Sequence, residues 1–183
     1  KNPNEYDKAI IVLNKENNVK AYYSTCIEQY RQMGSTIKPL LVYAPAIEEN
    51  VIDACSIIND EKTDFGGYTP SNYNGKYYGY VSAKFALAKS LNTCAVKILN
   101  STGIEKSKKY LQKTEIPLTE NDNSLRIALG STEKGATLLN IASAYGLFPN
   151  KGFYCNPCVI SKIVAENGKT IYATPQTRTK VFG

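Results

Sequence analysis

The amino-acid sequence predicts an α+β protein in which the helices are segregated from an antiparallel sheet. Three observations carry this prediction. Hairpin patterns open and close the chain, helical periodicity fills the region between them, and no internal repeat or low-complexity linker divides it. The length of 183 residues suits one domain. A domain of this size buries roughly 70% of the surface that its unfolded chain exposes.

The amino-terminal part predicts a hairpin followed by a helix. Residues 9–13 and 19–23 are β-prone runs on either side of turn-forming residues. From Ser35 as far as Val51, apolar residues recur mostly three or four positions apart, which indicates one face of a helix. Pro39 is compatible with this helix only near its start, where the missing N–H matters least.

The rest of the chain predicts a polar loop, four helices and a second hairpin. Residues 59–80 are rich in Gly, Tyr, Asn, Asp and Lys and show weak periodicity, so we expect a loop there. Residues 159–164 and 170–173 flank Asn167-Gly168, a dipeptide typical of hairpin turns. Helical spacing and helix-stop signals predict the four helices at residues 82–89, 93–100, 104–113 and 137–148.

The composition excludes several classes of function. The net charge of +6 is that of a mildly basic soluble domain, and the alternative is attraction to an anionic surface or polymer. Because no nucleic-acid-binding motif accompanies the charge, we expect no nucleic-acid partner. Histidine is absent, which removes Ser-His-Asp and Cys-His nucleophile systems and the usual His-containing zinc sites. We therefore expect no metal and no cofactor, and any acyl transfer must use another base.

The five cysteines do not predict a disulfide framework. Their number is odd, so at least one thiol stays free or pairs outside the chain. Cys155 and Cys158 have redox-motif spacing, but a redox pair normally opens a helix and a β-prone run follows here. We favour a structural role for these two residues.

Ser35 and Lys38 are candidates for a nucleophile and its general base. Residues at positions i and i+3 of a helix share a face, so the Lys38 amine could reach the Ser35 hydroxyl. A serine hydroxyl needs a base to take its proton, and lysine serves only if its pKa is lowered towards neutrality. Taken alone, Ser-x-x-Lys is common, and its alternative is a helix cap followed by a solvated lysine.

Ser90 and Asn92 form a second candidate pair, between two short predicted helices. A hydroxyl and a carboxamide two residues apart on a loop could point into one cleft. There the hydroxyl could relay a proton and the carboxamide could bind a substrate amide. The alternative is that Asn92 or Thr93 simply caps the next helix.

Three blocks of sequence, in order, resemble the transpeptidase domain of penicillin-binding proteins. Residues 33–40, MGSTIKPL, resemble the family's Gly-Ser-x-x-Lys-Pro block, and residues 87–97, LAKSLNTCAVK, resemble its Ala-x-Ser-x-Asn block. Residues 129–132 and 142–148 resemble the segment that precedes the active-site sheet in bifunctional, class A members. The resemblance follows the family's order over almost all of residues 9–173.

The resemblance implies a β-lactamase/transpeptidase-like fold, an antiparallel sheet with a helical subdomain, and a D,D-transpeptidase that cross-links peptidoglycan stem peptides. It implies that Ser35 is acylated by a D-Ala-D-Ala stem peptide or by a β-lactam antibiotic. Lys38 would be the base, Ser90 the proton relay and Asn92 a ligand for the donor peptide's amide. The parent would carry a membrane anchor and a glycosyltransferase domain and would lie at the extracytoplasmic face of the bacterial cell membrane.

One family signature, a Lys-Thr-Gly strand that binds the substrate carboxylate, has no match. Gly168-Lys169-Thr170-Ile171 has isoleucine where glycine is needed and lies at the expected hairpin turn. We therefore expect residues 1–183 to form a transpeptidase domain that is incomplete at its carboxy-terminal end, without the central strands of the sheet. The alternatives to a transpeptidase are a non-turnover β-lactam-binding or sensor module of the same fold and a serine β-lactamase, for whose deacylating water no acidic motif is evident.

Overall fold

The computed structural model describes residues 6–25, 29–175 and 177–183. The chain divides into two compact units. The strand unit comprises Lys1–Arg31, Lys113–Ile116 and Ala136–Gly183, and the helical unit comprises Gln32–Gln112 and Pro117–Gly135. Helices and small antiparallel sheets are both present, so the α+β prediction is confirmed.

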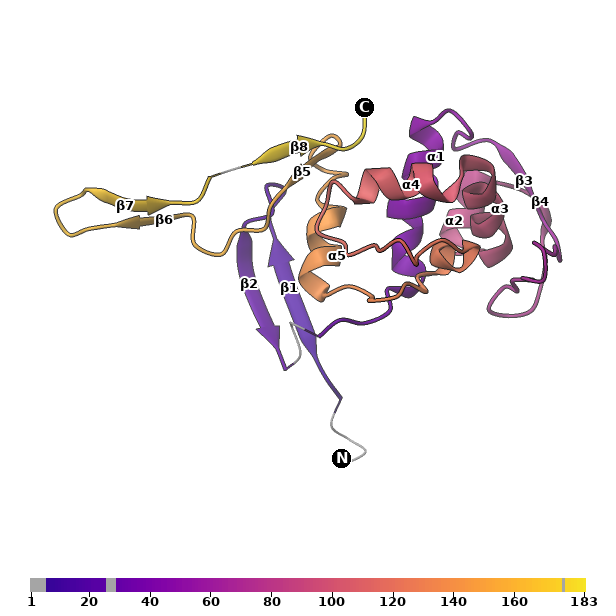
Figure 1. Ribbon diagram of the computed structural model, residues 1–183, viewed down its shortest axis with the longest axis horizontal. Coiled ribbons are helices and arrows are strands. Elements are labelled where there is room, and N and C mark those ends of the chain that lie inside the picture. Colours follow the sequence, from indigo (N-terminus) through magenta and orange to yellow (C-terminus); the bar gives the residue numbers. More distant parts are fainter. Residues whose placement is uncertain (1–5, 26–28, 176) are drawn as a thin grey trace. The chain divides into compact units, whose positions relative to one another are not determined.

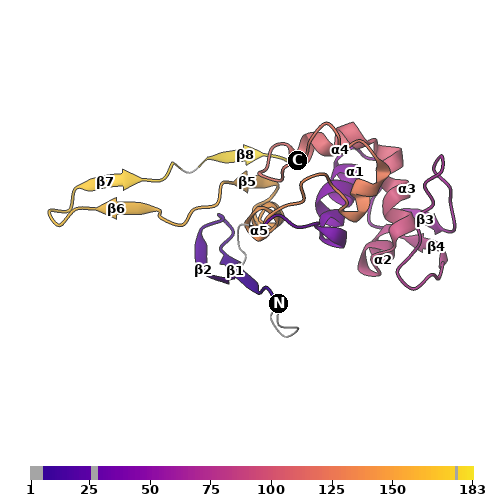
Figure 2. The ribbon, with the colours of Figure 1, turned by 60° about the horizontal axis from the view of Figure 1, so that its bottom comes forward.

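In the strand unit, β1 (Ala9–Leu13) pairs antiparallel with β2 (Val19–Ser24), which confirms the first predicted hairpin (Figures 1 and 2). The second predicted hairpin is also present, as β6 (Lys162–Val164) and β7 (Thr170–Ala173) around the Asn167-Gly168 turn. It begins three residues later than expected. A further pair, β5 (Phe153–Cys155) with β8 (Arg178–Lys180), was not predicted because three-residue strands carry almost no periodicity.

Helix α5 (Leu138–Tyr145) is the helix of the strand unit. It starts where expected, because Thr137 and Asn140 form a reciprocal capping box that satisfies backbone N–H groups at the helix start. Behind it, the carboxamide of Asn17 is almost fully buried and donates to the carbonyl oxygens of Ser143 and Cys155. These hydrogen bonds tie the β1–β2 turn to α5 and β5.

The helical unit has a core of apolar side chains that are inaccessible to solvent. Its helices are α1 (Ala44–Glu48), α2 (Ala83–Ala88), α3 (Asn92–Thr102) and α4 (Ile104–Leu111), with a 3₁₀ turn at Leu125–Leu129. The fully buried core side chains include Ile37, Leu40, Leu41, Val96, Leu99, Leu111 and Ile127. Most of them belong to the segments predicted as helices, whereas Ile127 belongs to the 3₁₀ turn, for which no helix was predicted. Helices α2, α3 and α4 lie close to their predicted positions.

The helix predicted to begin near Ser35 is not a regular α-helix. It starts as a 3₁₀ turn (Gly34–Ile37), continues as a π-helical turn (Lys38–Tyr43) and becomes α-helical only in α1. It ends at Glu48, before the expected Val51. Pro39 lies at the start of the π-helical turn, and helical irregularities of this kind are frequent at functional sites.

The prediction of a loop over residues 59–80 is wrong at both ends. Strands β3 (Ile57–Asp60) and β4 (Gly79–Ser82) pair antiparallel there and enclose the polar segment between them. Apolar side chains of the pair, Ile58 and Val81, pack against buried residues of α2 and α3. Figure 2 shows the β3–β4 pair beside these two helices. The described residues thus hold four separate two-stranded sheets rather than one continuous sheet.

Candidate active site

Ser35 is held at the start of the helical segment by a close approach of two glycine backbones. A methyl group added to Gly130 would lie 2.2 Å from the backbone nitrogen of Gly34. Both glycines have positive φ angles, 55° for Gly34 and 82° for Gly130, a region that favours glycine. This contact fixes the backbone that leads into Ser35, whose side chain is exposed.

Lys38 is fully buried, and its ammonium group has neutral hydrogen-bond partners. The Nζ atom donates to the carbonyl oxygen of Ser90 at 2.7 Å, to the Ser90 hydroxyl at 3.0 Å and to Oδ1 of Asn92 at 2.7 Å. Burial lowers the pKa of Lys38 from 10.5 to about 8. The alternative of a solvated lysine after a helix cap is therefore wrong for this residue.

Ser90 adopts a left-handed backbone conformation with a φ of 53°. This conformation is uncommon for serine, and it lets both the carbonyl oxygen and the hydroxyl of one residue contact Lys38. Strain of this kind persists when surrounding structure over-determines it and is concentrated at functional sites. The strain therefore marks Ser90 as a candidate functional residue, independently of its place in a motif.

Asn92 opens α3 but does not cap it. The helix has Leu91 at its N-cap, with no side-chain capping bond. The Asn92 side chain instead bridges two groups, accepting from Lys38 and donating through Nδ2 to the carbonyl oxygen of Ser71 at 2.8 Å. The capping alternative for Asn92 is wrong.

These residues meet at one cavity of about 470 Å³. Ser35, Ser90 and Asn92 line it, while Lys38 lies buried behind them. Sequence spacing predicted a contact between Lys38 and Ser35, but the side-chain hydrogen bonds that the structure shows for Lys38 go to Ser90 and Asn92. The remaining lining residues are Asn72, Tyr73, Asn74, Tyr78, Lys89 and Leu91.

Two residues of this network were missed at the level of sequence. Asn72 accepts from the backbone N–H of Asn92 at 2.7 Å, and the buried Asp60 carboxylate accepts from Asn72. Both belong to the segment that was predicted as a polar loop. The available signal was the apolar pair Ile57-Ile58 directly before Asn59-Asp60, which is typical of a short strand ending in polar residues.

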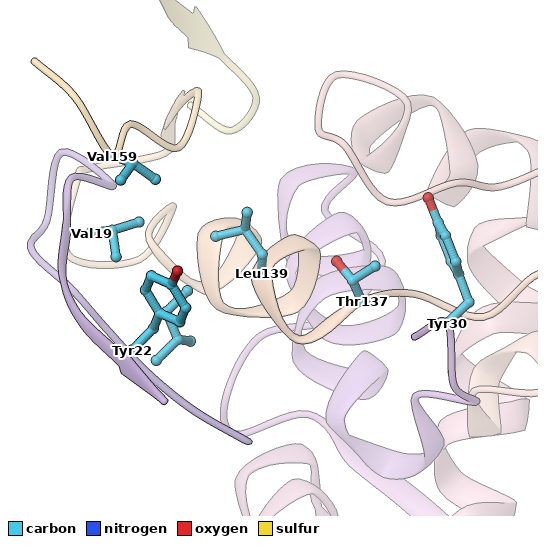
Figure 3. A pocket seen from close by; sticks show the side chains of 7 residues that line it. Val19, Tyr22, Tyr30, Thr137, Leu139 and Val159 are labelled. Atoms are coloured by element: carbon cyan, nitrogen blue, oxygen red, sulfur yellow. The ribbon is translucent and has the colours of Figure 1, made fainter. Parts of the chain in front are cut away.

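A second cavity, of about 480 Å³, lies in the strand unit and has a different character. Figure 3 shows Val19, Tyr22 and Val159 gathered on the side that Leu139 of α5 faces. Its lining is mainly apolar and contains neither a lysine nor a carboxylate. Of these two cavities, the one beside Ser35 therefore holds the predicted site residues.

Other candidate chemistry is not assembled in the described part of the chain. No group of three or more His, Cys, Asp or Glu residues there could hold a metal ion. Cys55, Cys94, Cys155 and Cys158 carry free thiols, and Cys26 lies outside the described residues. Cys155 is the last residue of β5, and Cys158 forms an isolated backbone β-bridge with Asn18. Neither cysteine therefore opens a helix, as one of a redox pair normally would. No described helix combines the length and the hydropathy that crossing a membrane requires.

Comparison with known families identifies the family of this chain. The family model "Penicillin binding protein transpeptidase domain" matches residues 1–181. The chain belongs to this family. As a transpeptidase domain of a penicillin-binding protein, it has the β-lactamase/transpeptidase-like fold that the three sequence blocks implied.

Individual relatives support the same assignment. The transpeptidase domain is 41% identical over 152 residues to penicillin-binding protein 1F of Bacillus subtilis, covering 83% of the chain and 21% of that relative. It superimposes on penicillin-binding protein 1A of Haemophilus influenzae with a TM-score of 0.79 and 26% identity, over 94% of the chain and 28% of that structure. The PonA1 protein of Mycobacterium tuberculosis, solved in complex with penicillin V, gives a TM-score of 0.78 at 22% identity, over 91% of the chain and 50% of that structure. The chain thus spans about a fifth of the Bacillus relative's length.

The Gly168-Lys169-Thr170 segment lies at the turn of the β6–β7 hairpin and the start of β7, where the sequence predicted a hairpin turn. Gly168 takes the positive φ angle, 80°, that the turn requires. The backbone of the segment is thus used to close a hairpin.

Proposed function

We propose that this chain carries the nucleophile, the base and the proton relay of a serine D,D-transpeptidase that cross-links peptidoglycan. The observation that carries the proposal is the buried Lys38 amine. It is held by Ser90 and Asn92 directly behind the cavity that Ser35 lines. Family membership supports the reaction class, and the complex of PonA1 with penicillin V supports β-lactams as a class of ligand.

The proposed reaction begins with neutral Lys38. Its amine takes the proton of the Ser35 hydroxyl as the serine oxygen attacks the carbonyl carbon between the two D-Ala residues of a stem peptide. The tetrahedral intermediate collapses, the C–N bond breaks, and the terminal D-Ala leaves as its amine after receiving a proton through the Ser90 hydroxyl. The acyl group is then bonded to Ser35.

Transfer reverses these proton movements. The amine of an acceptor stem peptide attacks the acyl-enzyme carbonyl, loses a proton through Ser90 to Lys38, and the serine oxygen leaves with a proton. Asn92 would bind the donor peptide's amide, because its carboxamide already lies at the cavity. A β-lactam would acylate Ser35 by the same first step, with opening of its ring in place of D-Ala release.

We infer a class A peptidoglycan synthase as the parent protein. It would have a membrane anchor and a glycosyltransferase domain and would act at the extracytoplasmic face of the bacterial cell membrane. The support is the match to penicillin-binding proteins such as 1F of Bacillus subtilis, of which the chain spans 21%.

The test uses the protein at its full natural length, a fluorescent penicillin and a D-Ala-D-Ala peptide with an acceptor amine. We expect labelling and transfer in the parent, no labelling in Ser35→Ala, and strongly reduced labelling in Lys38→Ala. Ser161→Ala and Lys84→Ala, two exposed residues outside the site, are the matched controls. Equal labelling of the Ser35 variant and the parent would refute the nucleophile. Labelling without any transfer or release would favour the sensor module.

A further inference from the structure

A buried carboxylate lies behind the site that the proposed mechanism uses. The Asp60 side chain is fully buried at the end of β3. It accepts from the Asn72 carboxamide at 2.9 and 3.0 Å, from the backbone N–H of Tyr78 at 2.9 Å and from the Thr93 hydroxyl. A buried charge is costly unless it is well hydrogen-bonded, so this set of donors indicates a carboxylate with a fixed position.

The hydrogen bonds that the structure shows for Asp60 do not include one from the Lys38 amine. Burial and then the Asp60 carboxylate raise the pKa of the Cys94 thiol to about 12, so this neighbour stays neutral. Lys97 of α3 does not donate to Asp60. Its ammonium group donates to the carbonyl oxygen of Asn59, in β3, and to the Glu61 carboxylate. The donors to Asp60 are therefore uncharged groups. Asn72 and Tyr78 belong to the segment after β3, and Thr93 belongs to the first turn of α3.

Asn72 connects this carboxylate to Asn92. Its Nδ2 group donates to Asp60 and to the carbonyl oxygen of Lys76, and its Oδ1 accepts from the backbone N–H of Asn92. Asn72 is 4% exposed. The orientation of its carboxamide is determined because the nitrogen has only acceptors as partners and the oxygen has a donor. Thr93, the next residue along α3, is bonded directly to Asp60. The backbone around Asn92 is thus anchored at two successive residues.

Asn92 passes this anchoring to the base, because its Oδ1 accepts from Lys38 at 2.7 Å. We propose that Asp60, Asn72 and Thr93 are positioning residues for acylation, which hold Asn92 and through it the Lys38 amine. The inference rests on the proposed function, since it assigns a role relative to that site. Asp60 and Asn72 lie outside the three sequence blocks and Thr93 lies within the second one. In the proposed role all three act without touching the reacting atoms.

A purely structural role makes a different prediction. If the network only supported the fold, its loss would reduce acylation in proportion to the fraction of protein unfolded. If it positions the base, a folded variant would bind β-lactam normally and react slowly. Misplacement of a catalytic group by about 1 Å costs on the order of 100-fold in rate, so the two roles are separable.

The experiment measures the acylation rate constant at saturating fluorescent penicillin, and the concentration for half-maximal rate, in the full-length protein. Thr93→Val removes one donor to Asp60 with little change in shape, and Thr93→Ser restores the hydroxyl. We expect Thr93→Val to lower the rate constant about tenfold with the half-maximal concentration nearly unchanged, and Thr93→Ser to recover most of it. Asn72→Ala, which removes the link itself, should lower the rate constant by about 100-fold.

Asn17→Ala is the matched control, because Asn17 is also buried and bonded to backbone carbonyls but belongs to the strand unit. It should acylate at the parent rate once the folded fraction is accounted for. A folded Thr93→Val that acylates at the parent rate, or a Thr93→Ser that fails to restore the rate, would overturn the positioning role. If Asn72→Ala does not fold, the comparison of Thr93→Val with Thr93→Ser tests the positioning role by itself. An unlabelled parent would instead overturn the proposed function, and the positioning role with it.

Discussion

Replacing Asn92 by aspartate should shift the pH range in which the site is acylated. In the structure Oδ1 of Asn92 lies 2.7 Å from the Lys38 amine, and both the Ser90 partners of that amine are neutral. An aspartate would place a carboxylate at this distance from a fully buried lysine. Because an adjacent opposite charge favours the charged form of a group, the pKa of Lys38 should rise.

The size of the effect follows from the lysine's present environment. Burial lowers the pKa of Lys38 from 10.5 to about 8. Relative to an ordinary lysine, this shift favours the neutral amine by roughly 3 kcal/mol. At pH 7 a group with this pKa is neutral in ~10% of molecules, against ~0.03% for an ordinary lysine. A carboxylate at hydrogen-bond distance raises a neighbouring amine's pKa by about one to three pH units. The neutral fraction at pH 7 should therefore fall by roughly 10- to 1,000-fold in Asn92→Asp.

The assay is the second-order rate constant for acylation by a fluorescent penicillin between pH 6 and pH 10, which reports the pKa of the base in the free enzyme. The parent should gain about tenfold per pH unit below pH 8 and level off above it. Asn92→Asp should react slowly at pH 7 and recover as the pH rises towards 10, whereas Asn92→Ala should stay slow throughout. A parent profile that is flat from pH 6 to pH 9, or an Asn92→Asp variant without alkaline recovery, would refute Lys38 as the base.

Three further predictions concern single residues of the helical unit. Ser90→Gly keeps the carbonyl contact to Lys38 and accepts the φ of 53° without strain, so acylation should slow about 100-fold while thermal stability is retained; a parent-like rate would exclude Ser90 as the relay. Gly130→Ala would force a methyl group to within 2.2 Å of Gly34, and denaturant unfolding should show a loss above about 2 kcal/mol together with lost labelling; a stable, labelled variant would contradict this. Leu99→Ala, at a fully buried position, should cost about 3 kcal/mol in urea unfolding, and a loss below about 1 kcal/mol would show that its cavity collapses.

The pH dependence of folding gives an independent check on Lys38. Its pKa in the fold lies below its ordinary value, so between pH 8 and pH 10.5 the unfolded chain binds more protons than the folded chain. Stability should therefore rise with pH across this window, because the buried amine loses its charge. In Asn92→Asp the same lysine has a charged partner, and this rise should shrink.

Much of the fold was predictable because its helices are amphipathic over several turns. The apolar positions of α3 face the core, and Asn167-Gly168 set the turn of the second hairpin. The 3₁₀ and π turns around Lys38 were not predictable, because they keep apolar spacing close to that of an α-helix. Strands β3 and β4 were missed because four residues with mixed burial show no alternation.

The site shows the same division between local and long-range information. Ser35 and Lys38 lie close in sequence, and Ser90 and Asn92 do too, so short motifs revealed each pair. The hydrogen bonds between the pairs join residues 52 and 54 positions apart, and spacing alone suggested a Ser35–Lys38 contact in their place. The positive φ of Ser90, which allows the contact, could not be predicted from the residue type, because serine rarely adopts this conformation.

The proposed role of Lys38 as a base requires that its amine be neutral in part of the molecules near pH 7, and its separation from the Asp60 carboxylate favours this. Asp60 and Lys38 both belong to the helical unit and both exclude solvent. A direct ion pair between them would satisfy both charges and would raise the pKa of Lys38 out of reach of neutral pH. Two asparagines stand between the charges instead, and each carboxamide offers an oxygen to one neighbour and an N–H group to another. The two carboxamides are uncharged, so they orient the groups around the Lys38 amine without placing a charge beside it, and burial is the largest cause of its lowered pKa.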